Sequence, residues 1–309
     1  MGTTWTAKFL QPAASLDPVA TSEKIAARLE VLEQQFSTYR QNSDLSRFNA
    51  SASTDGIAAP PELVQLALEA RRLSDFTDGA FDVTVAPLVC LWGFGPQGRG
   101  NTLPTESEIT EARALVGWRQ LEARTSPPAL RKTAGGVSAD FSSIAKGLAS
   151  DLISELLAAL GAPDHFVQIG GDVRTGGHAA DGTAWRTGIE EPRENGGTIA
   201  CVVALSGQAL STSGNYRNFV TLDGRRYGHI LDPRTGRPAA GALAAVSVVH
   251  ATCARSSALA TALFVLGEDA GLAFATREKI AAVFFIHAGD SFTQHRTPEF
   301  EEFSSSRPR

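Results

Sequence analysis

The sequence has few cysteines, no long apolar run and no excess of positive charge. Its three cysteines, Cys90, Cys201 and Cys253, are scattered, odd in number and outside any CxxC pair. This spacing excludes a disulfide framework and gives no support for a zinc site. No apolar run approaches the roughly 18 residues that a membrane span requires. The formal net charge of −5 argues against a nucleic-acid-binding face, which needs clustered basic residues.

Several common motifs are also missing. There is no GxxxxGK[ST] and no GxSxG, so a P-loop enzyme and an α/β-hydrolase are both unsupported. The sequence contains no internal repeat and no low-complexity block. The opening MGTTWTAKFL has no basic or apolar leader and no lipid-attachment cysteine ahead of it. Two interpretations stay open: a cytoplasmic protein, or a targeting segment upstream of this sequence.

What the chain does contain is typical of a large globular protein. Its 309 residues are 43% hydrophobic, which is enough to bury a sizeable core. Helical and strand patterns interleave without a strict period, which predicts an α+β or mixed α/β fold. The 29 glycines fall mostly between short apolar runs and favour an active site built from loops. The predicted helices are 21–37, 60–76, 138–161 and 255–267, and the predicted strands are 3–10, 165–177, 185–192, 198–205, 244–251 and 281–288.

Some boundaries of these elements carry specific expectations. Thr21 or Ser22 is expected to cap the first helix, and Thr105 with Glu108 has the spacing of a capping box. The polar segment 38–56 has the composition of a loop, and the C-terminal residues from about 298 to 309 are expected to fray. The helix over 138–161 is expected to bury a leucine stripe and to end at a glycine. That stripe consists of Leu148, Leu152, Leu156 and Leu160, with Ile153 and Leu157 beside it, and the terminating glycine is Gly161.

Three segments carry more chemistry than packing demands. In YGHILDPRTGRP, turn geometry explains Asp232, Pro233 and Gly236, but it does not explain His229. This favours a functional histidine. In ADFSSIAKG, Lys146 lies near the start of a helix, where backbone N–H groups already favour an anion. The third segment is ALSTSGNYRNF, which on its own is typical of a serine-rich turn.

A glycine-rich segment after a strand, GGDVRTGG, suggests a phosphate-binding loop. The Rossmann fingerprint requires GxGxxG at the start of a helix. Here polar turn residues and another strand candidate, WRTGIEEP, follow the glycines. A Rossmann fold is therefore not expected.

Taken together, these segments resemble the ApbE-type FAD:protein FMN transferases. The matching blocks, in chain order, are MGTTW, STYRQNSDLSRFN, DGAFDVTVAPLVCLWGFG, ADFSSIAKGLASD, VQIGGDV, STSGNYRNF, HILDPRTG and SSALATALFVLG. Several blocks in the right order are more specific than any one of them.

The resemblance implies a fold and an activity. It implies one mixed α/β flavin transferase domain over 1–309, with two lobes and FAD held in a cleft between them. Members transfer the FMN half of FAD, with Mg²⁺, to a threonine or serine hydroxyl of a partner protein, and AMP leaves. Some relatives hydrolyse FAD to FMN and AMP instead. The expected partner is therefore an acceptor flavoprotein subunit, typically of a membrane redox complex.

The resemblance also assigns roles to residues. His229 is the expected base for the acceptor hydroxyl, and Asp232, grouped with it as catalytic, shapes the turn together with Thr235. Lys146 is suited to a phosphate or a polar edge of the flavin. Flavin contacts are expected from Met1 with Gly2 at the opening, from Tyr39 by stacking, and from the GAFD block, where Asp82 can accept a hydrogen bond. The other expected flavin-binding residues are Ala80, Phe81, Ser213 and Asn215.

The expected metal site departs from the family pattern. The matching positions are Ala145, through its backbone carbonyl, and Ser257 and Thr261 on one helix face. The family usually has an aspartate where this chain has Ser257, and Mg²⁺ normally keeps one or two carboxylates. Weak Mg²⁺ binding through the FAD pyrophosphate, Ala145 and Thr261 is expected.

The lost aspartate leaves alternatives to an active transferase. One is a flavin-binding protein with little or no transfer activity, and another is an FAD pyrophosphatase. Retention of His229 and Lys146 favours the transferase. From the resemblance, a periplasmic protein or an inner-membrane lipoprotein is expected, although this sequence carries no signal peptide or lipobox.

Overall fold

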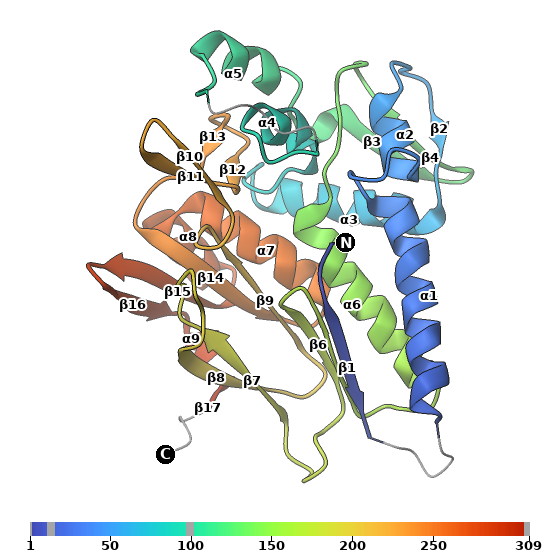
Figure 1. The fold of residues 1–309 in the computed structure, drawn as a ribbon, viewed down its shortest axis with the longest axis vertical. Coiled ribbons are helices and arrows are strands. Elements are labelled where there is room, and N and C mark those ends of the chain that lie inside the picture. Colours follow the sequence, from blue (N-terminus) through green and yellow to red (C-terminus); the bar gives the residue numbers. More distant parts are fainter. Residues whose placement is uncertain (1, 11–15, 97–101, 306–309) are drawn as a thin grey trace. The chain divides into compact units, whose positions relative to one another are not determined.

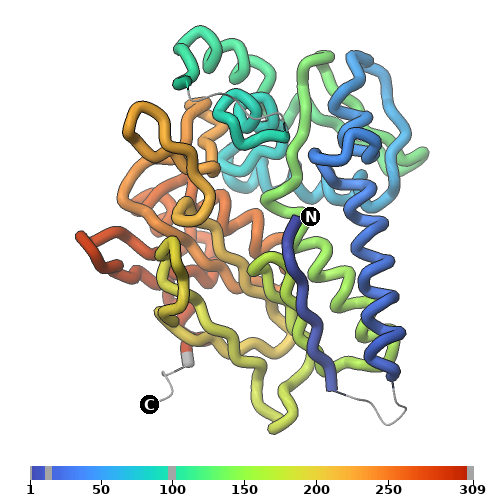
Figure 2. The backbone as a smooth tube through the Cα atoms, viewed as in Figure 1, coloured from blue at the N-terminus to red at the C-terminus, as the bar shows by residue number. Residues whose placement is uncertain are grey.

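The structure is a computed structural model that describes residues 2–10, 16–96 and 102–305. The chain divides into two compact units, each assembled from segments distant in the sequence, as the colours along the tube in Figure 2 show. Unit 1 comprises residues 1–31, 144–217 and 241–309. Unit 2 comprises residues 32–143 and 218–240.

Unit 1 is built around an antiparallel sheet of seven strands in the order β1-β5-β6-β9-β14-β15-β16 (Figure 1). The first strand of the chain pairs with a strand near its middle, so sequence order and sheet order differ. The strands are β1 (Trp5–Phe9), β5 (His165–Ile169), β6 (Asp172–Gly176), β9 (Ala209–Gly214), β14 (Leu243–His250), β15 (Ala281–Ala288) and β16 (Ser291–Arg296).

Both faces of this sheet are covered. Seven of the eight residues of β14 are buried, which is typical of a strand with packing on each side. Ala245 and Val249 belong to a core cluster shared with β7 (Trp185–Glu190) and β8 (Ile199–Leu205). These two strands form a smaller sheet with β17 (Ser304–Ser305). Since side chains alternate along a strand, Val246 and Val248 face the other side, where α7 (Cys253–Leu266) packs against β14.

Unit 2 is mainly helical. Its three-stranded sheet β2-β4-β3 packs against α3 (Pro61–Phe76), and two short hairpins follow later in the chain. The remaining elements are α2 (Asp44–Ala50), α4 (Ala86–Leu91), α5 (Glu106–Arg113), β2 (Ile57–Ala58), β3 (Leu121–Thr125), β4 (Pro128–Lys132), β10 (Phe219–Leu222), β11 (Arg225–Gly228), β12 (Leu231–Asp232), β13 (Arg237–Pro238) and the 3₁₀ turns η1 (Val83–Val85) and η2 (Trp118–Gln120). Helix α1 (Pro18–Phe36) begins in unit 1 and ends in unit 2.

The predicted mixed α/β class is confirmed, and so are the principal helices and strands. The capping box is present: Thr105 and Glu108 exchange side-chain and backbone hydrogen bonds at the start of α5. The glycine pair between β5 and β6 closes an antiparallel hairpin rather than opening a helix. This confirms that the segment is not a Rossmann turn. In the part of the chain that the structure describes, no helix has the length and apolar character needed to cross a membrane.

Three local predictions are wrong. The first helix begins at Pro18, because Asp17 accepts the N–H of Val19; Thr21 and Ser22 are therefore not its cap. The segment predicted as a loop contains α2, whose start is capped by the Ser43 hydroxyl. The C-terminal segment is not frayed between residues 298 and 305, because these residues form α9 (Pro298–Glu301) and β17. Burial of an aromatic side chain there, Phe300, offsets the polar composition around it.

The predicted leucine stripe of α6 (Ser142–Ala159) is only partly confirmed, since Ile153 and Leu157 beside it are buried. Leu148, Leu152 and Leu156 are only partly buried. The helix buries the neighbouring face, on which small and polar residues alternate with larger apolar ones. Small side chains let the backbone of another helix come close, and this matters for the site described below. The buried face contains Gly147, Ser150, Asp151, Ile153, Ser154 and Leu157.

Lys132 is a fully buried lysine in unit 2. Its exposed fraction is 0%, and its ammonium group donates to the carbonyl oxygens of Phe48, Asn49 and Val137, each at 3.1 Å. Two of those carbonyls lie at the C-terminal end of α2, where a cation is favoured. Desolvation lowers the pKa of Lys132. The three hydrogen bonds offset the cost of burying the charge.

We therefore predict that Lys132→Met lowers the free energy of unfolding by about 3 kcal/mol, because three buried carbonyls lose a charged donor. Urea unfolding at neutral pH measures this change. Lys24→Met, on the exposed face of α1, is the matched control and should change stability by less than about 0.5 kcal/mol. Equal stability of the two variants would contradict the structural role of Lys132.

Candidate functional site

A two-glycine turn connects β5 to β6 in unit 1. Gly170 and Gly171 have φ angles of +56° and +95°, a region in which other residues are strained. A Cβ added at Gly170 would lie 2.9 Å from the Thr3 side chain and 3.1 Å from Cδ of Lys146. The turn therefore packs against the Lys146 side chain. Asp172 follows it as the first residue of β6.

Asp172 is a buried acid joined to α7. It is 3% exposed, and its Oδ2 accepts a hydrogen bond from the Ser257 hydroxyl at 3.2 Å. The pKa of Asp172 is raised by burial, while Lys146 and hydrogen bonds from Ser211 and Ser257 act in the opposite direction. Asp172 is 85 residues from Ser257 in the chain, so the sequence around Ser257 does not reveal this acid.

A chain of hydroxyl groups continues from Ser257. Thr261 Oγ1 donates to the Ser257 carbonyl oxygen at 3.2 Å and lies 3.0 Å from the Ser213 hydroxyl of β9. Ser257 and Thr261 thus share one face of α7, as their four-residue spacing predicts. The structure brings three of the predicted site residues, Ser213, Ser257 and Thr261, into one polar cluster with Asp172.

Helix α6, which carries Ala145 and Lys146, packs very closely on the start of α7. A Cβ added at Gly147 would lie only 2.4 Å from the carbonyl oxygen of Cys253, so only glycine allows this approach. The close packing fixes Ala145 and Lys146 relative to the helix that bears Ser257 and Thr261.

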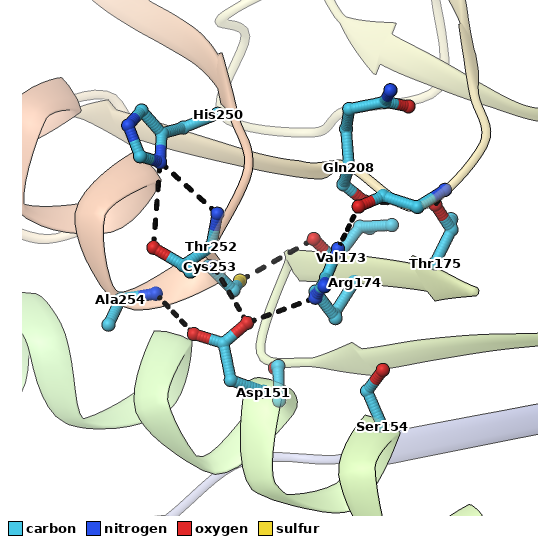
Figure 3. Close-up of polar contacts among 12 residues, drawn as sticks. Asp151, Ser154, Val173, Arg174, Thr175, Gln208, His250, Thr252, Cys253 and Ala254 are labelled. Atoms are coloured by element: carbon cyan, nitrogen blue, oxygen red, sulfur yellow. Dashed lines mark hydrogen bonds and ion pairs between the residues drawn. The ribbon is translucent and has the colours of Figure 1, made fainter. Parts of the chain in front are cut away.

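Asp151 of α6 caps α7, as Figure 3 shows. Its two carboxylate oxygens accept the backbone N–H groups of Cys253 and Ala254, at 2.8 and 2.9 Å. These donors have no partner within the helix. Arg174 of β6 completes the arrangement with Nε 3.2 Å from Oδ1 of Asp151. One carboxylate therefore connects α6, α7 and β6.

The N-terminal strand lines a small polar pocket in unit 1. Arg217 supplies its positive charge, and the backbone of the two-glycine turn forms part of its wall. The predicted flavin contact Met1 lies outside the described residues. Gly2 comes immediately before Thr3, the first lining residue of the pocket in the sequence. The lining residues are Thr3, Thr4, Trp5, Thr6, Gln168, Gly170, Gly171 and Arg217.

His229 lies between the two hairpins of unit 2. Its Nδ1 is 3.1 Å from the carbonyl oxygen of Asn218, and its ring meets Phe94 edge-on at 6.3 Å between centroids. Because a carbonyl oxygen only accepts hydrogen bonds, Nδ1 carries the proton of the neutral ring. Nε2 is then the nitrogen that can act as a base.

Asp232 shapes the turn that follows His229. Its carboxylate accepts three hydrogen bonds from Arg234, and its carbonyl oxygen accepts the N–H of Gly236 at 2.8 Å. Trp92 donates its indole N–H to the Gly236 carbonyl oxygen at 2.9 Å and anchors the far side of the turn. These contacts are those of a turn-forming residue, as expected of Asp232.

The remaining predicted flavin contacts differ greatly in exposure. Ala80 and Phe81 are each 1% exposed, whereas Tyr39, three residues after the end of α1, is 69% exposed. Asp82 caps η1 by accepting the N–H and hydroxyl of Thr84, and burial raises its pKa. The ring of Tyr39 is therefore accessible to a ligand. The carboxylate of Asp82 already accepts two hydrogen bonds from Thr84. Asn215 follows β9 directly.

The chain is similar along nearly its whole length to proteins of one family. The model of the ApbE family matches residues 1–284. A Vibrio cholerae protein named FAD:protein FMN transferase is 37% identical over 305 residues, which are 99% of this chain and 91% of that protein. The solved structure of flavin transferase ApbE from Vibrio cholerae has a TM-score of 0.89, with 37% identity, covering 98% of this chain and 96% of that one. The apo flavinyl transferase ApbE of Pseudomonas stutzeri has a TM-score of 0.90, with 40% identity, covering 100% and 95%.

This chain belongs to the ApbE family.

Membership of the ApbE family confirms the resemblance and the fold inferred from the sequence blocks. Asp151 and Asp172 were not among the site residues expected from the sequence. The blocks ADFSSIAKGLASD and VQIGGDV contain both acids, but only the fold shows that each reaches α7. Proximity in space, not the motif, identifies their partners.

The polar cluster of unit 1 contains hard oxygen donors of the kind that Mg²⁺ prefers. The cluster contains the carboxylate of Asp172 and the hydroxyls of Ser213, Ser257 and Thr261. Mg²⁺ prefers oxygen ligands and often uses few carboxylates when phosphates supply the rest. Within residues 2–10, 16–96 and 102–305, no three His, Cys, Asp or Glu side chains gather in a way that could hold a metal. The donor set therefore fits Mg²⁺ bound together with a phosphate group, rather than a transition-metal site.

We predict a pH-dependent stability from Asp151. Desolvation raises its pKa from 3.8 to about 6, against the opposing effect of the two N–H groups and Arg174. Because the folded pKa exceeds the unfolded one, this contribution is fully present below about pH 4 and is lost as the pH rises through 6. The free energy of unfolding should fall by up to about 3 kcal/mol over this range.

Urea unfolding of the wild type and of Asp151→Asn at pH values from 4 to 7 tests this prediction. The amide does not titrate, so the stability of the variant relative to wild type should improve by about 3 kcal/mol as the pH rises. A stability difference that stays constant with pH would show that Asp151 does not titrate in this window.

Proposed function

We propose that this protein is an FAD:protein FMN transferase, which moves FMN from FAD to a hydroxyl group of an acceptor protein. The observation that carries the proposal is the full-length match to curated transferases of that name. The chain also provides chemical groups suited to the reaction. In unit 2, the imidazole of His229 has its Nδ1 against a carbonyl oxygen. In unit 1, a cluster of hydroxyls contains the carboxylate of Asp172, with Lys146 acting on it electrostatically.

FAD is the donor substrate. Lys146 is suited to meeting a phosphate oxygen of FAD, because it is the fifth residue of α6 and lies beside the two-glycine turn. Arg217, the hydroxyl of Ser213 and the amide of Asn215 are further polar groups for the same molecule. The exposed ring of Tyr39 is suited to stacking on the flavin or the adenine. The block of Ala80, Phe81 and Asp82 is buried. It contributes to the packing of unit 2 rather than to polar contacts with FAD.

The reaction is a phosphoryl transfer in which the acceptor is a threonine or serine side chain. The acceptor oxygen bonds to the FMN phosphorus, the bond from that phosphorus to the bridging oxygen breaks, and AMP leaves with the bridging oxygen. His229 Nε2 accepts the proton of the acceptor hydroxyl as the new bond forms. Asp232 and Arg234 hold the turn after His229. Such transfers depend mainly on positioning and on neutralising charge.

Magnesium fits this scheme as a bound cofactor. When present, it would neutralise negative charge on the pyrophosphate. Ala145, Ser257 and Thr261 are the ligands expected from the sequence, and Asp172 lies within hydrogen-bonding distance of one of them. The acceptor is a protein that presents a threonine or serine in an accessible segment, as expected for a flavoprotein subunit.

FAD hydrolysis is the second candidate. The neutral Ser257, in place of an acid, favours a weaker transfer activity, and water in the place of the acceptor hydroxyl would give FMN and AMP. The carboxylate of Asp172 beside Ser257 argues against that weakening, because an acid is still present in the cluster. Transfer to a protein is therefore the function that these residues support best.

We predict that His229→Ala lowers the rate of FMN transfer by about 10²–10⁴-fold, since general-base catalysis contributes about that much. Affinity for FAD, followed by quenching of flavin fluorescence, should change by less than about threefold. AMP release in the presence of an acceptor domain gives the rate. His295→Ala, at an exposed histidine in β16 of unit 1, is the matched control and should retain the wild-type rate.

Two outcomes would count against this assignment. An unchanged rate in His229→Ala would remove the imidazole from the mechanism. Equal AMP release with and without the acceptor domain would identify the protein as a hydrolase.

A further inference from the structure

We propose that Asp172 of β6 supplies the carboxylate ligand of the divalent cation that binds with FAD, and that Ser257 donates a hydrogen bond to this carboxylate. The inference rests on the proposed function and deepens it. It assigns the negative charge of the metal site to a strand 85 residues distant in sequence from Ser257.

The first support is position. Asp172 contacts Ser257 directly, and Ser257 is joined through its carbonyl oxygen to Thr261, whose hydroxyl reaches Ser213. The serine that donates to the Asp172 carboxylate therefore lies one helical turn before Thr261. Among the described residues, Asp172 belongs to no group of three or more acids, histidines or cysteines that could hold a metal.

The second support is charge. A serine hydroxyl is neutral and ligates Mg²⁺ poorly, whereas a carboxylate is a preferred ligand. If Ser257 and Thr261 bound the cation without Asp172, the protein would contribute no negative charge. A carboxylate has lone pairs for about four partners. Hydrogen bonds from Ser257 and Ser211 leave capacity for a metal ion.

The third support is rigidity. The two-glycine turn fixes the start of β6, and Arg174, two residues after Asp172, bonds to the same Asp151 that caps α7. The carboxylate of Asp172 is thus held relative to α7 by contacts on both sides of it. Because this side chain is already fixed, little conformational entropy is lost when a metal binds to it.

The competing explanation is a purely structural acid. In that case Asp172 would only balance the charge of Lys146 and satisfy the hydroxyls of Ser211 and Ser257. The two explanations differ in a measurable way: a structural acid affects folding, whereas a metal ligand affects cation affinity in a protein that is still folded.

The experiment measures Mn²⁺ affinity in the presence of saturating FAD, from the electron paramagnetic resonance signal of free Mn²⁺. We expect Asp172→Asn to weaken Mn²⁺ binding at least tenfold. FAD affinity in EDTA should stay within about threefold of wild type. Asp164→Asn, at a partly exposed acid of unit 1 that accepts the His178 N–H, is the control and should bind Mn²⁺ as wild type does.

Two further variants keep the test decisive if Asp172→Asn folds poorly. The double variant Asp172→Asn, Ser257→Asp transfers the carboxylate from residue 172 to its hydrogen-bond partner, residue 257. Its Mn²⁺ affinity should be within about threefold of wild type. Ser257→Ala alone should retain most of the affinity, because the serine is a donor to the ligand and not the ligand itself. Circular dichroism and thermal unfolding verify the fold of each variant.

The outcomes separate this inference from the proposed function. Wild-type Mn²⁺ affinity in folded Asp172→Asn would overturn the inference, as would loss of affinity in Ser257→Ala alone or no Mn²⁺ binding to the wild-type FAD complex. Failure of the wild-type protein to bind FAD in EDTA would instead overturn the proposed function.

Discussion

The candidate site of unit 1 depends on one physical constraint, the close packing of α6 against the start of α7. Gly147 permits that approach, and Asp151 secures it by accepting two backbone N–H groups of α7 that have no partner within the helix. Arg174 adds β6 to the same carboxylate. With these three elements fixed, Lys146, Asp172 and the hydroxyls of α7 are held in place before any substrate binds.

This arrangement carries a cost in stability that function explains. Two acids, Asp151 and Asp172, are almost fully buried, and burial raises the pKa of both. A core of apolar side chains would avoid that penalty. Natural proteins depart from good packing mainly where they bind or react. Buried acids, a strained glycine turn and a run of hydroxyls in unit 1 are consistent with a site that binds a cation.

Much of the fold was predictable because its signals are local. Periodicity and capping residues gave the helices, and the turn chemistry of DPRTG gave the hairpin after His229. The rest depended on distant partners. The buried face of α6 is set by α7, and the burial of Lys132 is set by carbonyl groups over 80 residues away in sequence. Asp172 could not be linked to Ser257 from the sequence, because only the order of the strands brings them together.

The central claim is that β6 and α7 together hold a cation against the phosphates of FAD. A crystal structure of the protein with FAD and Mn²⁺, with anomalous scattering recorded for manganese, tests it most directly. The account predicts one strong anomalous peak within about 2.3 Å of an Asp172 carboxylate oxygen and in contact with a phosphate oxygen of FAD. A peak bound elsewhere, or bound to Ser257 and Thr261 without Asp172, would contradict it.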